Sequence, residues 1–336
     1  MTVAGSVASV LSFGRSSVRN IVMGAVMTAL GAAAAPAQAA EYPDQAIQMV
    51  LSFPPGGATD FLARELAVRL GDKLGQSVVV VNRPGAAGLV GMQAAARSNA
   101  DGYNLYIASV GSSTIYEAIN GKQRVSLDDF DAVGGVAVTP HVLVTSHDLN
   151  LKSVDDLIGY LKGGERNYAA TGAGTMSNLE GEIFKEQTKT DALLIPYKGS
   201  GQAMPELITG TSAFMFDSIA SSLPQKETGR IKMLAVASPT RMSFLPDVPT
   251  FKELGIDGLE TANLFTLMVP KGTPPERTAK VEKALTEVRA DKEFQDKIAE
   301  SGFAVSDIAA ADTHKAINDQ SQFWLAKARE LKLAKE

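Results

Sequence analysis

The sequence has 336 residues, of which 45% are hydrophobic and 21% are charged, and its formal net charge is −5. This length allows one large domain or two medium domains with real cores, and the composition excludes disordered and fibrous proteins. The acidic balance argues against nucleic acid or an anionic membrane as the main partner, and the chain has no cysteine that could form a disulfide.

The N-terminal segment has the pattern of a secretory signal peptide. Arg15 and Arg19 precede the uncharged run "IVMGAVMTALGAAAA", and Ala37 and Ala39 give the small-x-small pattern of a signal peptidase site. A membrane anchor is the alternative, but the run is shorter than about 20 residues and rich in small side chains. We therefore predict a signal peptide over residues 1–39. The mature protein is then periplasmic and, without disulfides, depends on its core for stability.

The mature chain begins with strands and helices in alternation. Residues 49–53 have the pattern of a buried strand, and residues 59–70 have that of an amphipathic helix. The elements expected next are a strand at 77–83, a helix at 89–97, a strand at 104–110 and a helix at 111–119. Such alternation argues for parallel sheets with helices on their faces.

A second series of the same kind begins near residues 141–147. Its first helix, 153–163, has Ser153 as the expected N-cap and two aspartates in the first turn. The elements expected after it are strands at 167–172, 192–199, 212–218 and 231–238 and helices at 176–188 and 202–209. A strand from Leu264 and further helix complete the chain. We predict an α/β protein of two lobes, each a mainly parallel sheet flanked by helices.

Five strand ends share one composition, in which glycine and small hydroxyl residues lead into a helix. They are "FPPGGATD", "SVGSST", "TGAGTMSN", "YKGSG" and "FDSIASS". Ligands of open α/β sheets lie at the carboxyl ends of strands, and helix N-termini there offer unpaired N–H groups to an anion. One such junction could be a simple capped turn, but five together predict a cleft for a small polar molecule. Lys198 is the only cation among them, so the anion would be held without arginine.

Signatures of enzymes and metal sites are missing. We find no G-x-S-x-G, H-E-x-x-H or Walker motif, and no G-x-G-x-x-G that opens a helix. His141, His147 and His314 match no metal-ligand spacing and are expected in the core or on the surface. Asp60 is expected to stabilise a helix start or shape its loop, and Asp217 to cap a helix or accept a bond from a ligand. We predict no catalytic residue, no metal and no cofactor.

Nine segments, in order along the chain, resemble those of one protein family. They are "FPPGGATD", "VNRPGAAG", "ADGYNLYIAS", "GAGTMSNLEGE", "PYKGSGQA", "FMFDS", "LAVASPTR", "LPDVPTFKELG" and "VPKGTPPE". With them the chain resembles the Bug-type extracytoplasmic solute receptors, the binding components of tripartite tricarboxylate transporters. The segments cover nearly the whole mature chain, and their ordered set is highly specific.

The resemblance implies a two-lobed Venus-flytrap fold like that of type II periplasmic binding proteins. Residues 40–141 and 263–336 would form lobe 1, and residues 142–262 lobe 2. It also implies that backbone and hydroxyl groups of opposed loops grip a ligand carboxylate. The residues carried over from lobe 1 are Phe53, Gly56, Gly57, Ala58, Thr59, Asp60, Ser109, Gly111 and Ser112. Those from lobe 2 are Thr171, Gly172, Gly174, Thr175, Met176, Ser177, Tyr197, Lys198, Gly199 and Asp217.

Of three departures from the family pattern, the first two leave the identity of the ligand open and the third, at Val81, is interpreted as structural. The stretch "VGSSTIYEAING" replaces an Asn-Pro segment common after "IAS", Asn178 stands where histidine is common, and Val81 replaces a frequent acid. Mono-, di- and tricarboxylates, amino acids and aromatic acids all suit such a cleft.

The expected function is capture of a small carboxylate between the lobes and its delivery to the membrane components of a tripartite tricarboxylate transporter. We expect a monomer with no nucleic-acid partner. A solute-sensing partner of a signalling system and an α/β enzyme are the alternatives.

Overall fold

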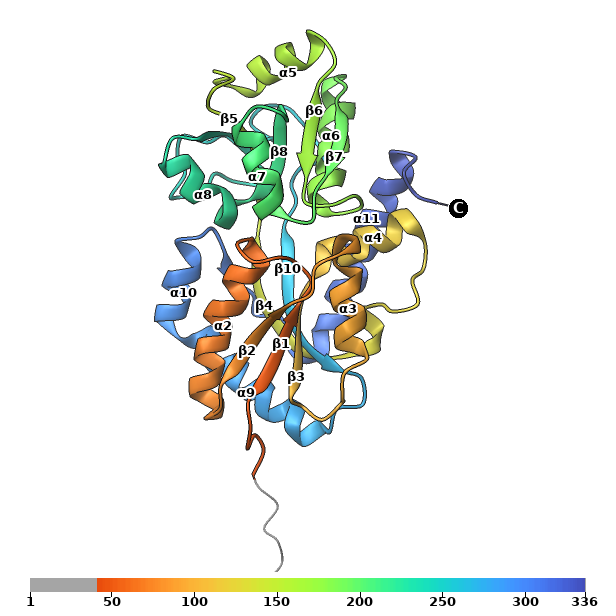
Figure 1. Cartoon of the computed structure of the whole chain (residues 1–336), viewed down its shortest axis with the longest axis vertical. Helices are drawn as coiled ribbons and strands as arrows, with labels where there is room; N and C mark the ends of the chain where they lie inside the picture. The colour runs from red at the N-terminus through yellow and green to blue at the C-terminus, as the bar shows by residue number, and fades with distance from the viewer. Residues whose placement is uncertain (1–40, 336) are drawn as a thin grey trace, which may run out of the picture. The chain divides into compact units, whose positions relative to one another are not determined.

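The structure, a computed structural model, describes residues 41–335 (Figure 1). The expected signal peptide, residues 1–39, lies outside them. Pro43–Glu336 forms one compact unit. Among the residues described, we find no helix with the length and apolar character needed to cross a membrane.

The first sheet has six strands in the order β11-β4-β10-β3-β1-β2. Their bounds are Ile47–Leu51 for β1, Val78–Asn82 for β2, Asn104–Ser109 for β3, Phe130–Thr139 for β4, Asn263–Pro270 for β10 and Ala304–Val305 for β11. Strand β1 lies parallel to both neighbours, with Met49 opposite Val80 on one side and Leu105 on the other. Strand β10 runs antiparallel between β3 and β4.

Helices flank this sheet on both sides (Figure 1). On one side α2 (Ala58–Leu74) contacts α9 (Pro275–Ala290) and α10 (Lys292–Ala299). On the other side are α3 (Leu89–Ala96), α4 (Val110–Asn120) and α11 (Ala310–Glu330), of which α4 and α11 pack together. Helix α2 buries Leu62, Leu66 and Leu70 completely, and this four-residue spacing is what fixes one face of the helix against the sheet. The carboxyl ends of the strands and the starts of α2 and α4 are thereby brought together.

The second sheet has five strands in the order β7-β6-β8-β5-β9. Their bounds are His141–Ser146 for β5, Asn167–Ala170 for β6, Leu193–Pro196 for β7, Phe214–Ser218 for β8 and Ile231–Val236 for β9. The helices between them are α5 (Val154–Lys162), α6 (Met176–Thr188), α7 (Ser200–Ile208) and α8 (Ile219–Glu227). Phe184, Phe214, Phe216 and Phe251 pack ring against ring in its core, with the Phe216 and Phe251 centroids 5.5 Å apart. This aromatic packing joins α6, through Phe184, to Phe214 and Phe216 of β8.

Two sheets flanked by helices confirm the predicted α/β class, but "mainly parallel" needs correcting because both sheets are mixed. Strands β2-β1-β3 and β7-β6-β8 are parallel, whereas β10 and β5 run antiparallel to their neighbours. The reason lies in the connections. The chain passes from β4, which the sequence reading missed, through Pro140 into β5 of the other sheet, and it returns through β10. Strands β5 and β10 therefore begin at the cavity, where their neighbours β8 and β3 end, and run antiparallel to them.

The strands of the first sheet lie within residues 47–139 and 263–305, and those of the second within 141–236. The division into two lobes at 141/142 and 262/263 stays a prediction, because Pro43–Glu336 is compact as a whole.

Candidate functional site

Two adjoining cavities lie among the loops that follow the strands, and Phe53 and Thr171 line both of them. The hydroxyl cavity, of about 490 Å³, is lined by Phe53, Pro54, Gly57, Ala58, Thr59, Ser109, Ser112, His141, Thr171, Gly199, Ser200, Asp217, Ser218, Asn263 and Phe265. The loop cavity, of about 920 Å³, is lined by Ser52, Phe53, Gly85, Ala86, Ala87, Gly88, Tyr116, Ile119, Asn120, Thr171, Gly172, Ala173, Gly174, Asn178, Tyr197 and Lys198. The hydroxyl cavity takes residues from strands of both sheets, and the loop cavity takes residues from loops and helices next to both sheets.

The structure brings thirteen of the nineteen predicted site residues to these cavities. The six that line neither are Gly56, Asp60, Gly111, Thr175, Met176 and Ser177. The side chains of Asp60, Thr175 and Ser177 and the backbone N–H groups of Gly56 and Gly111 form hydrogen bonds within the protein.

Asp60 shapes the loop before α2 from within. Its carboxylate accepts hydrogen bonds from the Arg64 guanidinium at 2.9 Å, from Asn82 Nδ2 at 2.9 Å and from the Gly56 N–H at 3.1 Å. Burial works to raise the pKa of Asp60, but these donors outweigh it and hold that pKa below its ordinary value. Gly56 has φ of +90°, so this is the loop position that needs glycine. Asp60 therefore positions the loop and leaves the cavity to its neighbours.

The start of α6 is likewise built from internal bonds. Thr175 Oγ1 donates to the Gly172 carbonyl at 2.8 Å, and Ser177 Oγ donates to the Phe216 carbonyl at 2.5 Å. Asn178 accepts the Gly174 N–H through Oδ1 at 2.9 Å. These bonds fix the shape of the 171–174 loop, whose other residues line the loop cavity.

Helices α2, α4 and α7 begin at the wall of the hydroxyl cavity, and none of them is capped by its own N-cap side chain. Their N-cap residues, Gly57, Ser109 and Gly199, make no side-chain capping bond. Helix α5, by contrast, has a full capping box at Ser153. The first N–H groups of a helix have no intrahelical partner and carry partial positive charge. In α4 the Gly111 N–H is already bonded to Asn263 Oδ1, so the N-termini of α2 and α7 are the ones that supply backbone donors for an anion.

Asn263, which the sequence reading missed, orients one hydroxyl of this wall as a donor. Its Nδ2 donates to Ser109 Oγ at 2.9 Å, and its Oδ1 accepts the Gly111 N–H at 3.0 Å. One lone pair of the Ser109 hydroxyl oxygen is thus occupied, and the hydroxyl proton can be donated to a ligand oxygen. Thr59 and Ser112 add hydroxyls that have no hydrogen-bond partner in the described part of the chain.

Asp217 orients the opposite wall. Its carboxylate accepts hydrogen bonds from Ser200 Oγ at 2.5 Å, Ser221 Oγ at 2.8 Å and Ser222 Oγ at 2.9 Å. Burial raises the pKa of Asp217, against the lowering effect of these hydroxyls and of His141. Because the Ser200 proton is directed to Asp217, Ser200 presents lone pairs to the cavity.

His141 is a lining residue that was expected in the core or on the surface. Its Nδ1 lies 2.6 Å from Glu180 Oε2, and its side chain is 10% exposed. Burial works to lower the pKa of His141, but Glu180 and Asp217 raise it above the ordinary 6.5. No motif marks this residue, because its position depends on the chain crossing at Pro140.

Glycines let the loops approach one another closely. Gly57 has φ of −94°, and a Cβ added there would meet no atom within 4 Å. At Gly199, where φ is +147°, a Cβ would lie 2.8 Å from Pro54. The smallness of Gly57 thus leaves room in the cavity, whereas that of Gly199 allows the 54–57 and 198–200 loops to touch.

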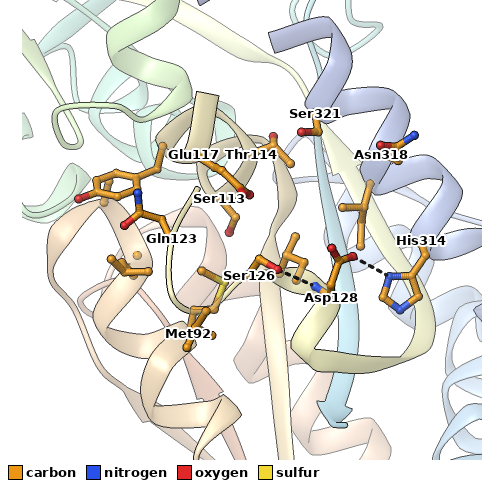
Figure 2. A pocket seen from close by; sticks show the side chains of 17 residues that line it. Met92, Ser113, Thr114, Glu117, Gln123, Ser126, Asp128, His314, Asn318 and Ser321 are labelled. Carbon is orange, nitrogen blue, oxygen red and sulfur yellow. Dashed lines mark hydrogen bonds and ion pairs between the residues drawn. The ribbon is translucent and has the colours of Figure 1, made fainter. Parts of the chain in front are cut away.

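A third cavity, of about 650 Å³, lies between α4, α11 and the 123–128 loop (Figure 2). Glu117 and Asp128 line it, and His314 Nδ1 lies 4.0 Å from Asp128. Burial, together with Asp128, raises the pKa of Glu117. The lining has two acids and no lysine or arginine, so it disfavours an anion. None of the predicted site residues lies there.

Comparison with known proteins gives one consistent result. A family model described as "Tripartite tricarboxylate transporter family receptor" matches residues 62–333. Protein BugT of Bordetella pertussis is 37% identical over 311 residues, which cover 91% of this chain and 95% of that protein.

Two solved structures have the same fold. The periplasmic binding protein BugD is 30% identical with a TM-score of 0.82, covering 88% of this chain and 100% of that one. R. palustris Rpa4515, solved with adipate, is 30% identical with a TM-score of 0.83, covering 88% and 99%.

Proposed function

Because the chain belongs to the receptor family of the tripartite tricarboxylate transporters, we propose that it binds a small carboxylate between its two sheets and delivers it to the membrane components of such a transporter. One observation carries the proposal: α2 and α7 begin, without side-chain caps, at the wall of one cavity rich in hydroxyls. The carboxylate-bound state of the relative Rpa4515 supports the ligand class.

The donors are sufficient in number for useful affinity. A hydrogen bond to a charged group contributes about 1.5–3 kcal/mol, and a micromolar site needs about 8 kcal/mol net. The first N–H groups of α2 and α7, together with the hydroxyls of Thr59, Ser109 and Ser112, reach that sum after ordering costs. The binding residues are those of the predicted set that line the two cavities. Neither a metal nor a cofactor is needed for this grip.

A thermal-shift screen over carboxylates tests the function. A ligand at about 100 times its Kd adds roughly 2.7 kcal/mol to the free energy of unfolding, which raises Tm measurably. The panel holds mono-, di- and tricarboxylates, amino acids and aromatic acids, with uncharged amides as controls. Stabilisation by amides and not by acids would contradict the proposal.

Export to the periplasm is the second part of the proposal. We expect residues 1–39 to be removed and the mature chain to start at or near Ala40. Intact mass of protein from the periplasmic fraction checks this start. Recovery of the full-length chain in the membrane fraction would reverse the assignment.

Two alternative functions can be distinguished from transport by experiment. A sensory receptor would bind the same solute, and its gene would lie beside a histidine kinase rather than beside two membrane-protein genes. An α/β enzyme would turn the bound solute over, and we expect no product after prolonged incubation. We propose a monomer, which light scattering of the mature protein checks.

A further inference from the structure

His141 is set into the wall of the hydroxyl cavity and has one ring nitrogen unoccupied. It is the first residue of β5, directly after Pro140. Nδ1 is paired with Glu180 at 2.6 Å, and no residue of the described chain forms a hydrogen bond to Nε2. With only 10% of the side chain exposed, that nitrogen has the cavity as its remaining surroundings.

Glu180 holds the ring from behind. It lies on α6, is completely buried and lines neither of the two adjoining cavities. One of its carboxylate oxygens pairs with His141, and the other accepts the hydroxyl of Thr261, which precedes β10. Both oxygens are thus used inside the protein. A carboxylate on Nδ1 fixes the orientation of the imidazole and makes Nε2 the group that meets a ligand.

The charges around the ring favour its cationic form. Glu180 faces it from α6 and Asp217 from β8, and together they outweigh the effect of burial. The residues that the first sheet contributes to the lining carry no charge. His141 is also the only lining residue of the hydroxyl cavity that can be a cation. Asp217 opposes an anion less than its charge suggests, because three hydroxyls occupy its oxygens.

We propose that His141 is a specificity-determining residue, which donates its Nε2–H to a second carboxylate of the solute while the helix N-termini hold the first. The inference rests on the proposed function and narrows its ligand class to acids with two anionic groups. It also assigns Glu180 and Thr261 as positioning residues for the imidazole.

Matched acid pairs test this at neutral pH by calorimetric titration. The probes are succinate with butyrate, glutarate with valerate and adipate with hexanoate, each pair equal in carbon number. We expect at least one dicarboxylate to bind about tenfold or more tightly than its partner, as a charged hydrogen bond allows. His141→Leu should remove this difference by weakening dicarboxylate binding much more than monocarboxylate binding. His141→Gln, a neutral donor, should keep part of the difference.

The Glu180→Gln variant distinguishes an electrostatic effect of Glu180 on His141 from a purely structural role. It keeps an acceptor for Nδ1 but removes the charge that favours the imidazolium. Dicarboxylate affinity should therefore decline at lower pH than in the wild type, while monocarboxylate affinity stays flat. His147→Gln is the matched control, since that histidine side chain is 57% exposed and lines none of the three cavities. Circular dichroism verifies folding, and His141→Gln serves if the leucine variant fails to fold.

The outcomes separate the two proposals. Equal affinity within every pair in the wild type, or an unchanged preference in His141→Leu, overturns the role of His141 and leaves carboxylate binding intact. If no acid in the full carboxylate screen binds, the proposed function itself is wrong, and the inference falls with it.

Discussion

Single residues determine how much space the cavity offers to a ligand and in which direction its hydroxyl groups point. Gly57 leaves the cavity open, Asn263 directs the Ser109 proton into it, and Asp217 turns the Ser200 proton away. Lys198 is exposed at the edge of the loop cavity and donates no side-chain hydrogen bond within the described residues. These placements favour geometry over a direct ion pair as the source of affinity.

We expect Gly57→Val to weaken binding by several kcal/mol and Lys198→Ala by only about 1 kcal/mol, as for a solvated charge. The valine blocks the approach of the carboxylate to the start of α2. An ordinary φ and an empty surrounding mean that the variant should fold normally. Calorimetric titration of the best acid from the thermal-shift screen, with and without chelator, measures both costs. Loss of binding in Lys198→Ala with normal binding in Gly57→Val would show that a salt bridge to Lys198, and not the backbone N–H groups, holds the carboxylate.

The buried His141 predicts how stability depends on pH. Its folded-state pKa is raised above 6.5, so its stabilisation is complete below that pH and is lost as pH rises through the folded pKa. The pKa of Asp217 is raised above 3.8, so it acts with the same sign as pH rises from 3.8 through its folded-state pKa. We expect the free energy of unfolding of the unliganded protein to fall as pH rises above about 6.5, and His141→Gln to flatten this fall.

Denaturant titrations in a series of buffers measure this dependence. His147→Gln is the control and should keep the wild-type slope. A stability that rises with pH through this window would show that the imidazole is neutral in the folded protein.

At the scale of elements, contact between loops from opposite sheets decides how tightly the cavity is enclosed. The Pro54 ring lies against Gly199 at the start of α7, where an added Cβ would be 2.8 Å from it. A Cβ added at Gly174 would lie 3.3 Å from Tyr116, and one at Gly172 would lie 3.7 Å from Ala87. Glycine at these junctions thus allows the loops to pack closely, and it also leaves backbone N–H groups accessible to a ligand.

Gly199→Ala should weaken ligand binding by about 1–3 kcal/mol, because the methyl group would collide with Pro54 and the backbone angle would be strained. Calorimetry on the same acid measures the loss. Gly229→Ala is the matched control: its φ is +71°, but its added Cβ would meet no atom within 4 Å. Equal effects of the two substitutions would attribute the loss to backbone strain and not to the loop contact.

At the scale of the whole molecule, the chain passes between the sheets at Pro140 and again between β9 and β10. Two crossings of this kind are suited to a hinge. We expect a saturating acid to reduce the radius of gyration of the mature protein in small-angle scattering. The same acid with Gly57→Val should leave the scattering curve unchanged. Unaltered scattering of the wild type on binding would count against closure of the two lobes.

The sequence by itself determined the α/β class, the family and thirteen of the residues that line the two adjoining cavities. Hydrophobic runs and glycine-hydroxyl junctions are local signals, so 59–70 was recognised as part of α2, and the family resemblance is confirmed by the match over residues 62–333. The strand β4, with two glycines in "FDAVGGVAVT", lacked such a signal and was missed.

Only the tertiary structure decided which polar residues face the cavity. Asp60 and Ser177 stand in the right segments but are bonded inward, whereas His141 and Asn263 reach the cavity from chain crossings with no motif. The physical reason is that a side chain's role depends on its hydrogen-bond partners, and these come from distant segments. Glu180 and Thr261 lie 81 residues apart in sequence, yet through one carboxylate they orient the imidazole of His141.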